Sequence, residues 1–197
     1  MKLISLMCAL IGGLIASPDG PAQNPASQSG RWPGLALSDV AGALHTPREW
    51  ADKRAIVLLF VTTDCPLSNG YVPEFNRIAR AYTSHGIAFY AVQADSTIPV
   101  EEVRNHAREF GYEFPYLLDP QQSLAALTGA TTIPEAAVLS AEGRLEYLGR
   151  IDNRLEDYGR ARVLVTEHDL RDALDAVLAG RPVPHPRTNA VGCAITR

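Results

Sequence analysis

Residues 55–69 have the sequence AIVLLFVTTDCPLSN, an apolar run followed by a short polar segment that contains Cys65. Such a continuous apolar run is typical of a strand buried on both faces of a sheet. The next stretch, from Asn69 to Tyr82, places apolar residues at helical spacing, so we expect Cys65 at a strand-to-helix junction. At a helix start, the dipole and the free backbone N–H groups favour a thiolate, which is the reactive form of cysteine. The position therefore indicates redox or thiol chemistry, and the alternative is a buried, inert cysteine.

The composition of the 197 residues is that of an ordinary globular protein, with 46% hydrophobic and 20% charged residues. A chain of this length is sufficient for one domain with a hydrophobic core. The net charge is −4 and no basic stripe is present, so we expect no nucleic-acid partner. The sequence also lacks the glycine-rich signatures of nucleotide-binding loops, and we expect no cofactor.

The N-terminus has the features of a secretory signal peptide. Lys2 is followed by an apolar run over residues 3–16, which is too short to span a bilayer comfortably. Small residues predict cleavage after Ala22, which gives a signal peptide at residues 1–22 and a linker at residues 23–33. An uncleaved anchor is the alternative. We therefore expect an exported protein, periplasmic or secreted, without stable insertion in the membrane after cleavage.

Cleavage would remove Cys8 and leave Cys65 and Cys193. An even cysteine count in an exported protein permits a disulfide. Residues 181–197 form a Pro-rich tail, which we expect to be extended rather than helical. About 13 extended residues reach up to roughly 40 Å, whereas a domain of this size has a radius of gyration of roughly 15 Å. The tail is therefore long enough to bring Cys193 to Cys65, and Gly192 leaves no side chain that blocks the approach.

The rest of the sequence alternates between strand and helix patterns. Further strands are expected at 87–92, 135–139 and 145–151, with a short strand or hairpin at 35–40. Helices are expected at 69–82, 100–110, 120–127 and 167–178. Asp119 and Thr166 are candidates to cap the last two of these helices. The order predicts an α/β fold, with a mixed central sheet and helices on both faces, in a domain at residues 34–180.

Several polar residues near Cys65 have two interpretations. Asp64 opposes thiolate formation by like-charge repulsion. Ser68 and Asn69 are expected to cap the following helix, and a catalytic role is the alternative. Glu74 is either a proton-exchange partner of the sulfur across the helix turns or a solvated side chain.

Arginines after the expected terminal hairpin are predicted to form ion pairs, with anion binding as the alternative: Arg150, Arg154, Arg160 and Arg162.

A set of features occurs in the order and spacing of the thioredoxin superfamily. Cys65 ends the first long strand, Pro73 follows eight residues later within the helix, and the segment TTIP at residues 131–134 precedes the terminal hairpin. The chain resembles exported redoxins of the thiol-disulfide and peroxiredoxin-like kind over residues 34–180. The resemblance implies a thioredoxin-like fold in which the Ile133–Pro134 bond is cis, faces the reactive sulfur and presents backbone that holds a partner chain.

The sequence departs from each branch of that superfamily. Ser68 stands where thioredoxins have a second cysteine, and Asn69 stands where copper-chaperone relatives have theirs. Thr62 matches the threonine of peroxiredoxins, but Leu58 replaces their proline. The tail segment TNAVGCAI at residues 188–195 resembles a subgroup of bacterial redoxins whose members often have the same tail cysteine.

The resemblance implies a thiol oxidoreductase with disulfide-exchange or antioxidant activity. The thiolate of Cys65 would attack a protein disulfide or the O–O bond of a small peroxide, and Cys193, or else an external thiol, would resolve the product. One alternative is a copper-handling module in which both sulfurs are ligands. Another is a non-catalytic interaction domain with a structural Cys65–Cys193 disulfide. The sequence leaves the oligomeric state open. The expected site residues are Cys65, Cys193, Thr62 and Pro134 for catalysis, and Ile133 and Pro66 for substrate binding.

Overall fold

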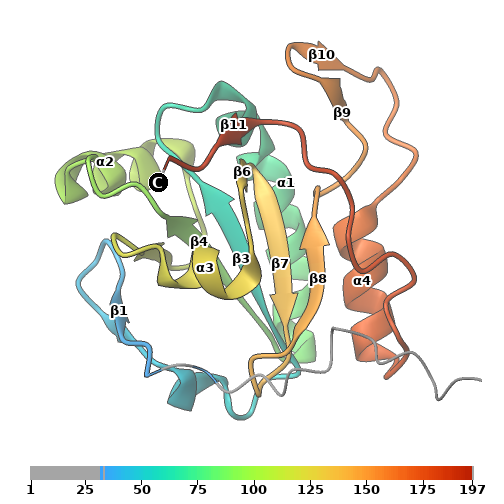
Figure 1. Ribbon diagram of the computed structural model, residues 1–197, viewed down its shortest axis with the longest axis horizontal. Coiled ribbons are helices and arrows are strands. Elements are labelled where there is room, and N and C mark those ends of the chain that lie inside the picture. The colour runs from blue at the N-terminus through green and yellow to red at the C-terminus, as the bar shows by residue number, and fades with distance from the viewer. Residues whose placement is uncertain (1–31, 33, 197) are drawn as a thin grey trace, which may run out of the picture.

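The computed structural model describes residue 32 and residues 34–196, and a five-stranded mixed sheet forms its centre (Figure 1). Three neighbouring strands, β3, β4 and β5, are parallel, and β7 and β8 run antiparallel to their neighbours. This arrangement is the mixed sheet that the alternating sequence pattern predicts. Across the sheet the strands are β5 (Tyr116–Leu118), β4 (Ile87–Gln93), β3 (Ala55–Val61), β7 (Glu135–Leu139) and β8 (Leu145–Gly149).

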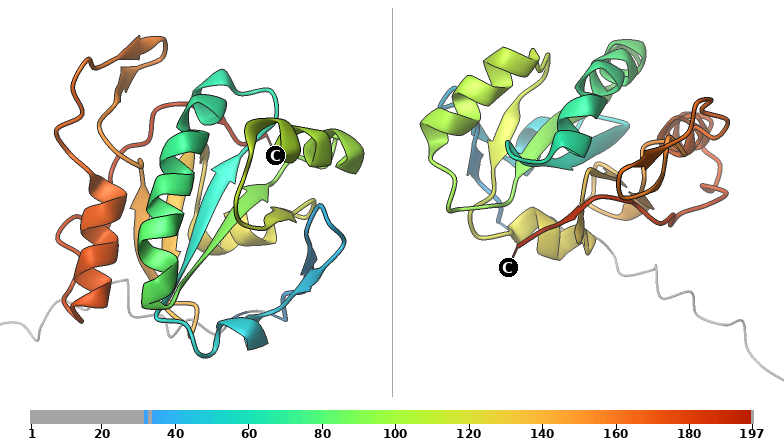
Figure 2. Two further views of the ribbon diagram at one scale, coloured as in Figure 1. Left: turned by 180° about the vertical axis from the view of Figure 1, so that it is seen from behind. Right: turned by 90° about the horizontal axis from the view of Figure 1, so that it is seen from above.

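Helices cover both faces of the sheet, as predicted. Figure 2 shows α1 (Pro66–Tyr82), α2 (Val100–Phe110) and α4 (Asp169–Leu178) on one face and α3 (Ser123–Thr128) on the other. A short 3-10 helix, η1 (Pro47–Trp50), adds its tryptophan to the α3 face.

The central strand β3 is buried along its whole length because both of its faces are covered. Val57 and Leu59 belong to the hydrophobic cluster beneath α1 and α4. Leu58 and Phe60 belong to the cluster on the opposite face, together with Leu124 of α3. Successive side chains of a strand point to opposite faces, so an unbroken apolar run supplies both cores. The strand thereby gives the segment that follows it a rigid starting point.

Smaller elements complete the fold. The hairpin of β1 (Leu37–Ser38) and β2 (Leu44–His45) agrees with the strand or hairpin expected near residues 35–40. A second 3-10 helix, η2 (Thr83–His85), follows α1. The sequence pattern gave no sign of four very short strands, which have few side chains with which to show a period: β6 (Thr132–Ile133), β9 (Leu155–Asp157), β10 (Arg160–Ala161) and β11 (Cys193–Ala194).

Helix starts differ from the predicted ones. The first helix begins at Pro66, so Cys65 is its N-cap and the expected caps Ser68 and Asn69 lie inside the first turn. Proline at the first helical position explains the earlier start, because its backbone is already set for a helix. The third helix begins at Ser123. The Asp119 carboxylate, which lies before the helix in the sequence, accepts hydrogen bonds from the backbone N–H groups of Ser123 and Leu124.

The last helix begins at Asp169, with His168 rather than Thr166 as its N-cap. The expected capping by Thr166 is wrong because that residue is bound elsewhere. The Asn153 side-chain amide donates to the Thr166 hydroxyl at 2.8 Å, and the Thr166 backbone N–H donates to Asn153 Oδ1 at 3.0 Å. The residue therefore fixes the loop that precedes the helix.

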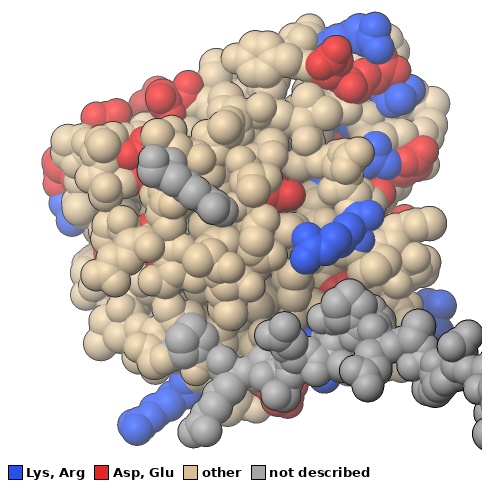
Figure 3. Space-filling model, in the orientation of Figure 1, with Lys and Arg blue, Asp and Glu red and all other residues tan. Residues whose placement is uncertain are grey.

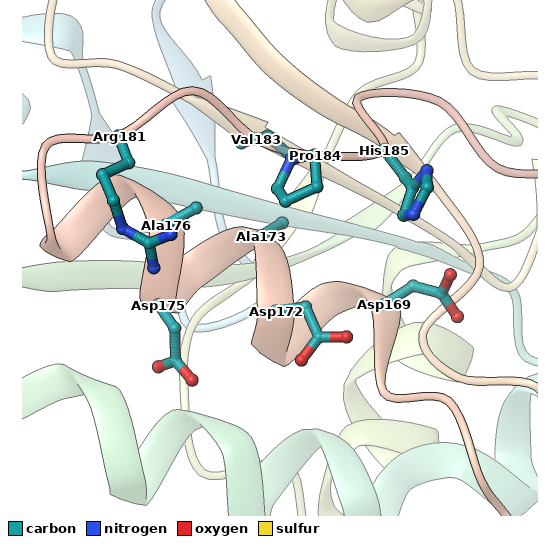
Figure 4. A pocket seen from close by; sticks show the side chains of 9 residues that line it. All are labelled: Asp169, Asp172, Ala173, Asp175, Ala176, Arg181, Val183, Pro184 and His185. Carbon is teal, nitrogen blue, oxygen red and sulfur yellow. The ribbon is translucent and has the colours of Figure 1, made fainter.

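The C-terminal tail is extended, as predicted, and it lies against the domain. Its first part crosses α4, and Figure 4 shows Val183 and Pro184 over the helix, with Asp172 and Asp175 on the helix beside a hollow. Leu148 of β8 then forms a bridge with Arg187. The tail ends in β11, which pairs antiparallel with β6.

Charged side chains lie mostly at the margins of the face shown in Figure 3, with a mixed group at the upper right, where Figure 1 places β9 and β10. The predicted arginine ion pairs are present. Arg160 and Arg162 both bind Glu156, at 2.9 and 2.8 Å, and Arg150 binds Asp169 at 2.8 Å.

The N-terminal predictions fall mostly outside the described residues. The predicted signal peptide at residues 1–22, and the predicted linker at residues 23–33 apart from Trp32, are not described. Trp32 stacks at a tilt against Trp50, with 4.5 Å between ring centroids. Within the described part of the chain, no helix is long and apolar enough to cross a membrane.

Glu74 is neither solvated nor a partner of the cysteine, contrary to both interpretations of its sequence position. Its side chain is 6% exposed and binds Arg171 of α4 at 2.9 Å and Arg77 at 2.7 Å. The carboxylate therefore joins α1 to α4.

We expect Arg171→Leu to lower the free energy of unfolding by about 2 kcal/mol, because it deprives a buried carboxylate of a partner from the facing helix. Arg77→Leu is the matched control and should cost less than about 1 kcal/mol, because that arginine is largely exposed. Urea denaturation measures both values. Equal losses for the two variants would contradict this assignment.

Candidate active site

Cys65 lies where β3 ends and α1 begins, as the sequence predicts. It is 1% exposed, has extended backbone dihedral angles and is followed by Pro66 in the first helical position. Its carbonyl oxygen accepts the first helical hydrogen bond, from the Asn69 backbone N–H at 3.0 Å. The sulfur is thus carried on the N-cap residue of a long helix, where backbone N–H groups and the helix dipole favour negative charge.

The Ile133–Pro134 bond is cis, which confirms the expectation from the TTIP segment. The Cys65 thiol donates to the Ile133 carbonyl oxygen at 3.7 Å. Ile133 is buried and belongs to the same hydrophobic cluster as Cys65. The predicted closeness of the proline-containing loop to the sulfur is therefore present in the structure.

The tail brings Cys193 to the same place. The two sulfurs, Cys65 Sγ and Cys193 Sγ, are 2.7 Å apart and both residues are free thiols. In the pairing of β11 with β6, Cys193 lies opposite Ile133 and Ala194 lies opposite Thr132. Figure 1 shows the two strands side by side at the end of the sheet where β3 ends. The site therefore combines three segments that are distant in the sequence.

The environment of Cys193 keeps its proton in place. Burial raises the pKa of the Cys193 thiol to about 11, with further contributions from its hydrogen bond to Cys65, from the charge of Cys65 and from the negative charge of Asp64. At neutral pH, Cys193 is therefore a thiol and must lose a proton before it can act as a nucleophile.

The Thr62 hydroxyl was expected to donate a hydrogen bond to the substrate, but its proton is directed elsewhere. Its hydroxyl donates to Asp64 Oδ1 at 2.9 Å and accepts from the Gln93 side-chain amide at 3.4 Å. A hydroxyl has one proton, so in this arrangement Thr62 has none to offer to a sulfur or a peroxide. Its position next to the site agrees with the prediction, and the direction of its hydrogen bond does not.

A histidine that the sequence did not single out supports the loop before Cys65. His106 Nε2 lies 2.9 Å from Asn69 Oδ1, and the Asn69 amide donates to the Thr63 carbonyl oxygen at 3.1 Å. Asn69 thus connects α1, α2 and the loop rather than capping a helix. Since the asparagine oxygen accepts, Nε2 of His106 is the protonated ring nitrogen. No local motif could have found this pair, because the residues are 37 positions apart.

Buried polar atoms collect beside this pair. Ser68 Oγ, His106 Nδ1 and Tyr112 Oη have no hydrogen-bond partner among the described residues. Burial lowers the pKa of His106 below its usual 6.5, against the opposing charges of Glu109 and Glu102. The imidazole is therefore neutral in the folded protein at pH 7.

The structure bears on metal binding as well. Among the described residues, no group of three or more His, Cys, Asp and Glu side chains is placed to hold a metal ion. The copper-handling alternative would have to rely on Cys65 and Cys193.

Comparison with known proteins identifies the family and the fold of this chain. A family model described as Redoxin matches residues 22–162. The structure of a hypothetical protein from Sinorhizobium meliloti 1021 is similar, with 31% identity and a TM-score of 0.74 over 87% of this chain and 95% of that one. A thiol:disulfide interchange protein of the thioredoxin family from Chlorobium tepidum TLS has 18% identity and a TM-score of 0.55 over 77% of this chain and 98% of its own. That likeness confirms the thioredoxin-like fold.

A curated relative is the thiol-disulfide oxidoreductase ResA of Geobacillus thermodenitrificans (strain NG80-2). It is 25% identical over 114 residues, which are 58% of this chain. The match spans 64% of the length of ResA.

We expect Asp64→Asn to lower the pKa of the Cys193 thiol, because the substitution removes a negative charge that opposes thiolate formation. The rate of alkylation of Cys193 by iodoacetamide as a function of pH, followed by mass spectrometry, measures the shift. Asp95→Asn removes a charge that does not contribute there and is the control. An unchanged or higher Cys193 pKa in Asp64→Asn would contradict the electrostatic account.

His106 should make stability depend on pH. Because burial lowers its pKa in the folded state, the unfolded chain binds more protons between the two pKa values. Its contribution is complete above about pH 6.5 and is lost as the pH falls towards the folded pKa. We expect the free energy of unfolding to decrease from about pH 7.5 to about pH 5.5, and to decrease less in His106→Gln. Parallel curves for the protein and this variant would disprove the assignment, and His85→Gln, at an exposed site, is the control.

Proposed function

Since the chain belongs to the Redoxin family, we propose that it is a thiol-disulfide oxidoreductase with Cys65 as the nucleophile and Cys193 as the resolving cysteine. The observation that carries this proposal is the 2.7 Å approach of the two sulfurs, produced by the pairing of β11 with β6. The N-cap position of Cys65 supports its role as the attacking group. The raised pKa of Cys193 supports a second, later role for the tail cysteine.

The proposed reaction has two exchange steps. In the first, the Cys65 thiolate attacks one sulfur of a protein disulfide, the partner's S–S bond breaks, and the released thiolate takes up a proton. In the second, Cys193 gives up its proton and attacks the Cys65 sulfur of the mixed disulfide. The Cys65–Cys193 bond forms as the mixed S–S bond breaks, the leaving sulfur takes up a proton, and the partner leaves as a dithiol. Two electrons pass from the cysteine pair to the partner, and the reverse sequence oxidises a dithiol.

The surrounding residues have supporting roles in this proposal. The Ile133 carbonyl oxygen accepts from the Cys65 thiol and fixes the sulfur beside the Pro134 loop. Pro66 begins the helix and leaves the N-cap to Cys65. Burial, the hydrogen bond to Cys65 and the charges of Cys65 and Asp64 together raise the pKa of Cys193, and Thr62 donates to Asp64.

Disulfides are favoured over peroxides as the substrate for a specific reason. Peroxide reduction would use a hydroxyl donor beside the sulfur, and the Thr62 proton is directed to Asp64. We further propose, from the N-terminal sequence, that the protein acts after export, in the periplasm or outside the cell. That compartment is where disulfides of client proteins persist.

The test is the reduction of insulin disulfides by the full chain with dithiothreitol as the electron source. Cys65→Ser should reduce the rate to that of dithiothreitol alone, with a free energy of unfolding within about 1 kcal/mol of the unsubstituted protein. In a separate reaction of pre-reduced protein without dithiothreitol, Cys193→Ser should accumulate a mixed disulfide with insulin at Cys65, visible as an added mass.

Full activity in Cys65→Ser would overturn the proposal. So would a reduced protein that reacts with hydrogen peroxide, forming sulfenic acid at Cys65, and does not react with insulin disulfides. The second result would establish a peroxidase instead.

A further inference from the structure

The residue directly before α3 has an unfavourable backbone conformation. Gln122 has a φ of 55° and a ψ of 32°, in the left-handed region. Among the described residues, it is the one residue other than glycine with a positive φ. The left-handed region is unfavourable for a residue with a Cβ atom, and glutamine is not among the residues that visit it routinely. Strain of this kind persists where the surrounding structure enforces it, and it often marks a functional position.

Helix capping does not account for this conformation. Gln122 is the N-cap of α3, but its side chain makes no capping hydrogen bond. The Asp119 carboxylate instead accepts from the backbone N–H groups of Ser123 and Leu124. An N-cap residue ordinarily has extended backbone and is Ser, Thr, Asp or Asn. Because Asp119 caps the helix, the Gln122 side chain is available for other partners.

The Gln122 side chain joins the sheet to the tail. Its Nε2 donates to the Ala94 carbonyl oxygen at 3.2 Å and also to the Thr196 carbonyl oxygen. Ala94 is buried and directly follows β4, whereas Thr196 lies just beyond β11. A carbonyl oxygen only accepts, so the amide presents its nitrogen, and its two hydrogens match the two acceptors. The strained residue therefore ties the end of the tail to the end of a core strand.

Cys193 lies between this contact and a second anchor. Toward the N-terminus, the Thr188 hydroxyl accepts a backbone N–H bond at 3.1 Å. Toward the C-terminus, Ile195 is buried and Gln122 binds the next residue, Thr196. Three positions separate Thr196 from Cys193, which is at most roughly 11 Å of extended chain. Because β11 has only two residues, contacts on both sides of the strand determine how precisely the Cys193 sulfur is placed.

We propose that Gln122 positions Cys193 for its attack on Cys65, and that the left-handed backbone at Gln122 is retained because it directs the side chain to the tail. This inference rests on the proposed function. Gln122 acts on the sulfur through the tail: by binding Thr196, it holds Cys193 Sγ at its distance of 2.7 Å from Cys65 Sγ. Holding the attacking group in place raises its effective concentration and speeds the resolving step.

Two substitutions separate the side chain from the backbone. Gln122→Gly and Gln122→Ala both remove the amide, but only glycine relieves the left-handed strain, because alanine keeps its Cβ atom. We therefore expect Gln122→Gly to have a Tm at least about 2 °C above that of Gln122→Ala. The positioning role predicts that both variants nevertheless lose the hold on the tail equally. Gln121→Ala, at an exposed neighbour with the same side chain, is the matched control.

Hydrogen exchange in the reduced full chain, followed by NMR, measures the hold on the tail. The Ile195 backbone N–H donates to the Thr131 carbonyl oxygen at 2.9 Å, so its exchange reports release of the tail. In both Gln122 variants this amide should exchange about threefold to tenfold faster, which is the range that one hydrogen bond contributes. Gln121→Ala should leave the rate unchanged. Faster exchange in only one of the two Gln122 variants, or in neither, would overturn the inference.

The resolving step gives the functional measurement. Oxidised glutathione added to the reduced protein places one glutathione on Cys65 as a mixed disulfide and releases the other as a thiol. Cys193 then loses its proton and attacks the Cys65 sulfur, and the bound glutathione leaves as a thiol after taking up a proton. Acid quenching and mass spectrometry follow the conversion of this adduct to the Cys65–Cys193 bond. We expect conversion to be about threefold to tenfold slower in both Gln122 variants and unchanged in Gln121→Ala.

The outcomes distinguish failure of the function from failure of this inference. If the unsubstituted protein forms no adduct on Cys65, or its adduct never becomes a Cys65–Cys193 bond, the proposed function itself fails. If the bond forms at one rate in all variants, the function stands and the positioning role of Gln122 is wrong. The same conclusion holds if the rate follows the Tm, so that Gln122→Ala is slow and Gln122→Gly is as fast as the unsubstituted protein.

Discussion

The antiparallel pairing of β11 with β6 is the constraint on which the site depends. It joins the last residues of the chain to the segment before Pro134 and sets Cys193 opposite Ile133. In that register the Cys193 sulfur lies beside the Cys65 sulfur, which contacts the Ile133 carbonyl oxygen. A shift of one residue along a strand turns every side chain to the other face, so this short ladder determines whether the two thiols meet.

The two cysteines lie on elements that are far apart in the sequence. Cys65 lies between a strand buried on both faces and a long helix, so its position is fixed by the core. Cys193 lies on a two-residue strand near the end of a tail. A second cysteine at the position of Ser68, as in the thioredoxin pattern, would lie on α1, the helix that Cys65 caps. Here the second thiol comes from the C-terminal tail, through the pairing of β11 with β6.

The parts of the structure that follow from local pattern could be predicted from the sequence. The apolar run that becomes β3, the helix junction at Cys65 and the reach of the tail depend on neighbouring residues and chain length. The side-chain partners could not be predicted, because they join distant positions. Asn69 and His106 are 37 positions apart, and Glu74 and Arg171 are 97 apart. In each case local reasoning assigned a cap or a solvated side chain, and tertiary packing supplied a different partner.

The reduction potential of the Cys65–Cys193 pair tests the central claim most directly. The full chain is equilibrated in glutathione buffers of defined potential, and the fraction of the linked cysteines is measured by mass spectrometry after acid quenching. The account predicts one two-electron transition between about −270 and −120 mV, the range of catalytic dithiols. A transition below about −300 mV would indicate a structural disulfide. Either that result or the absence of any Cys65–Cys193 bond would contradict the account.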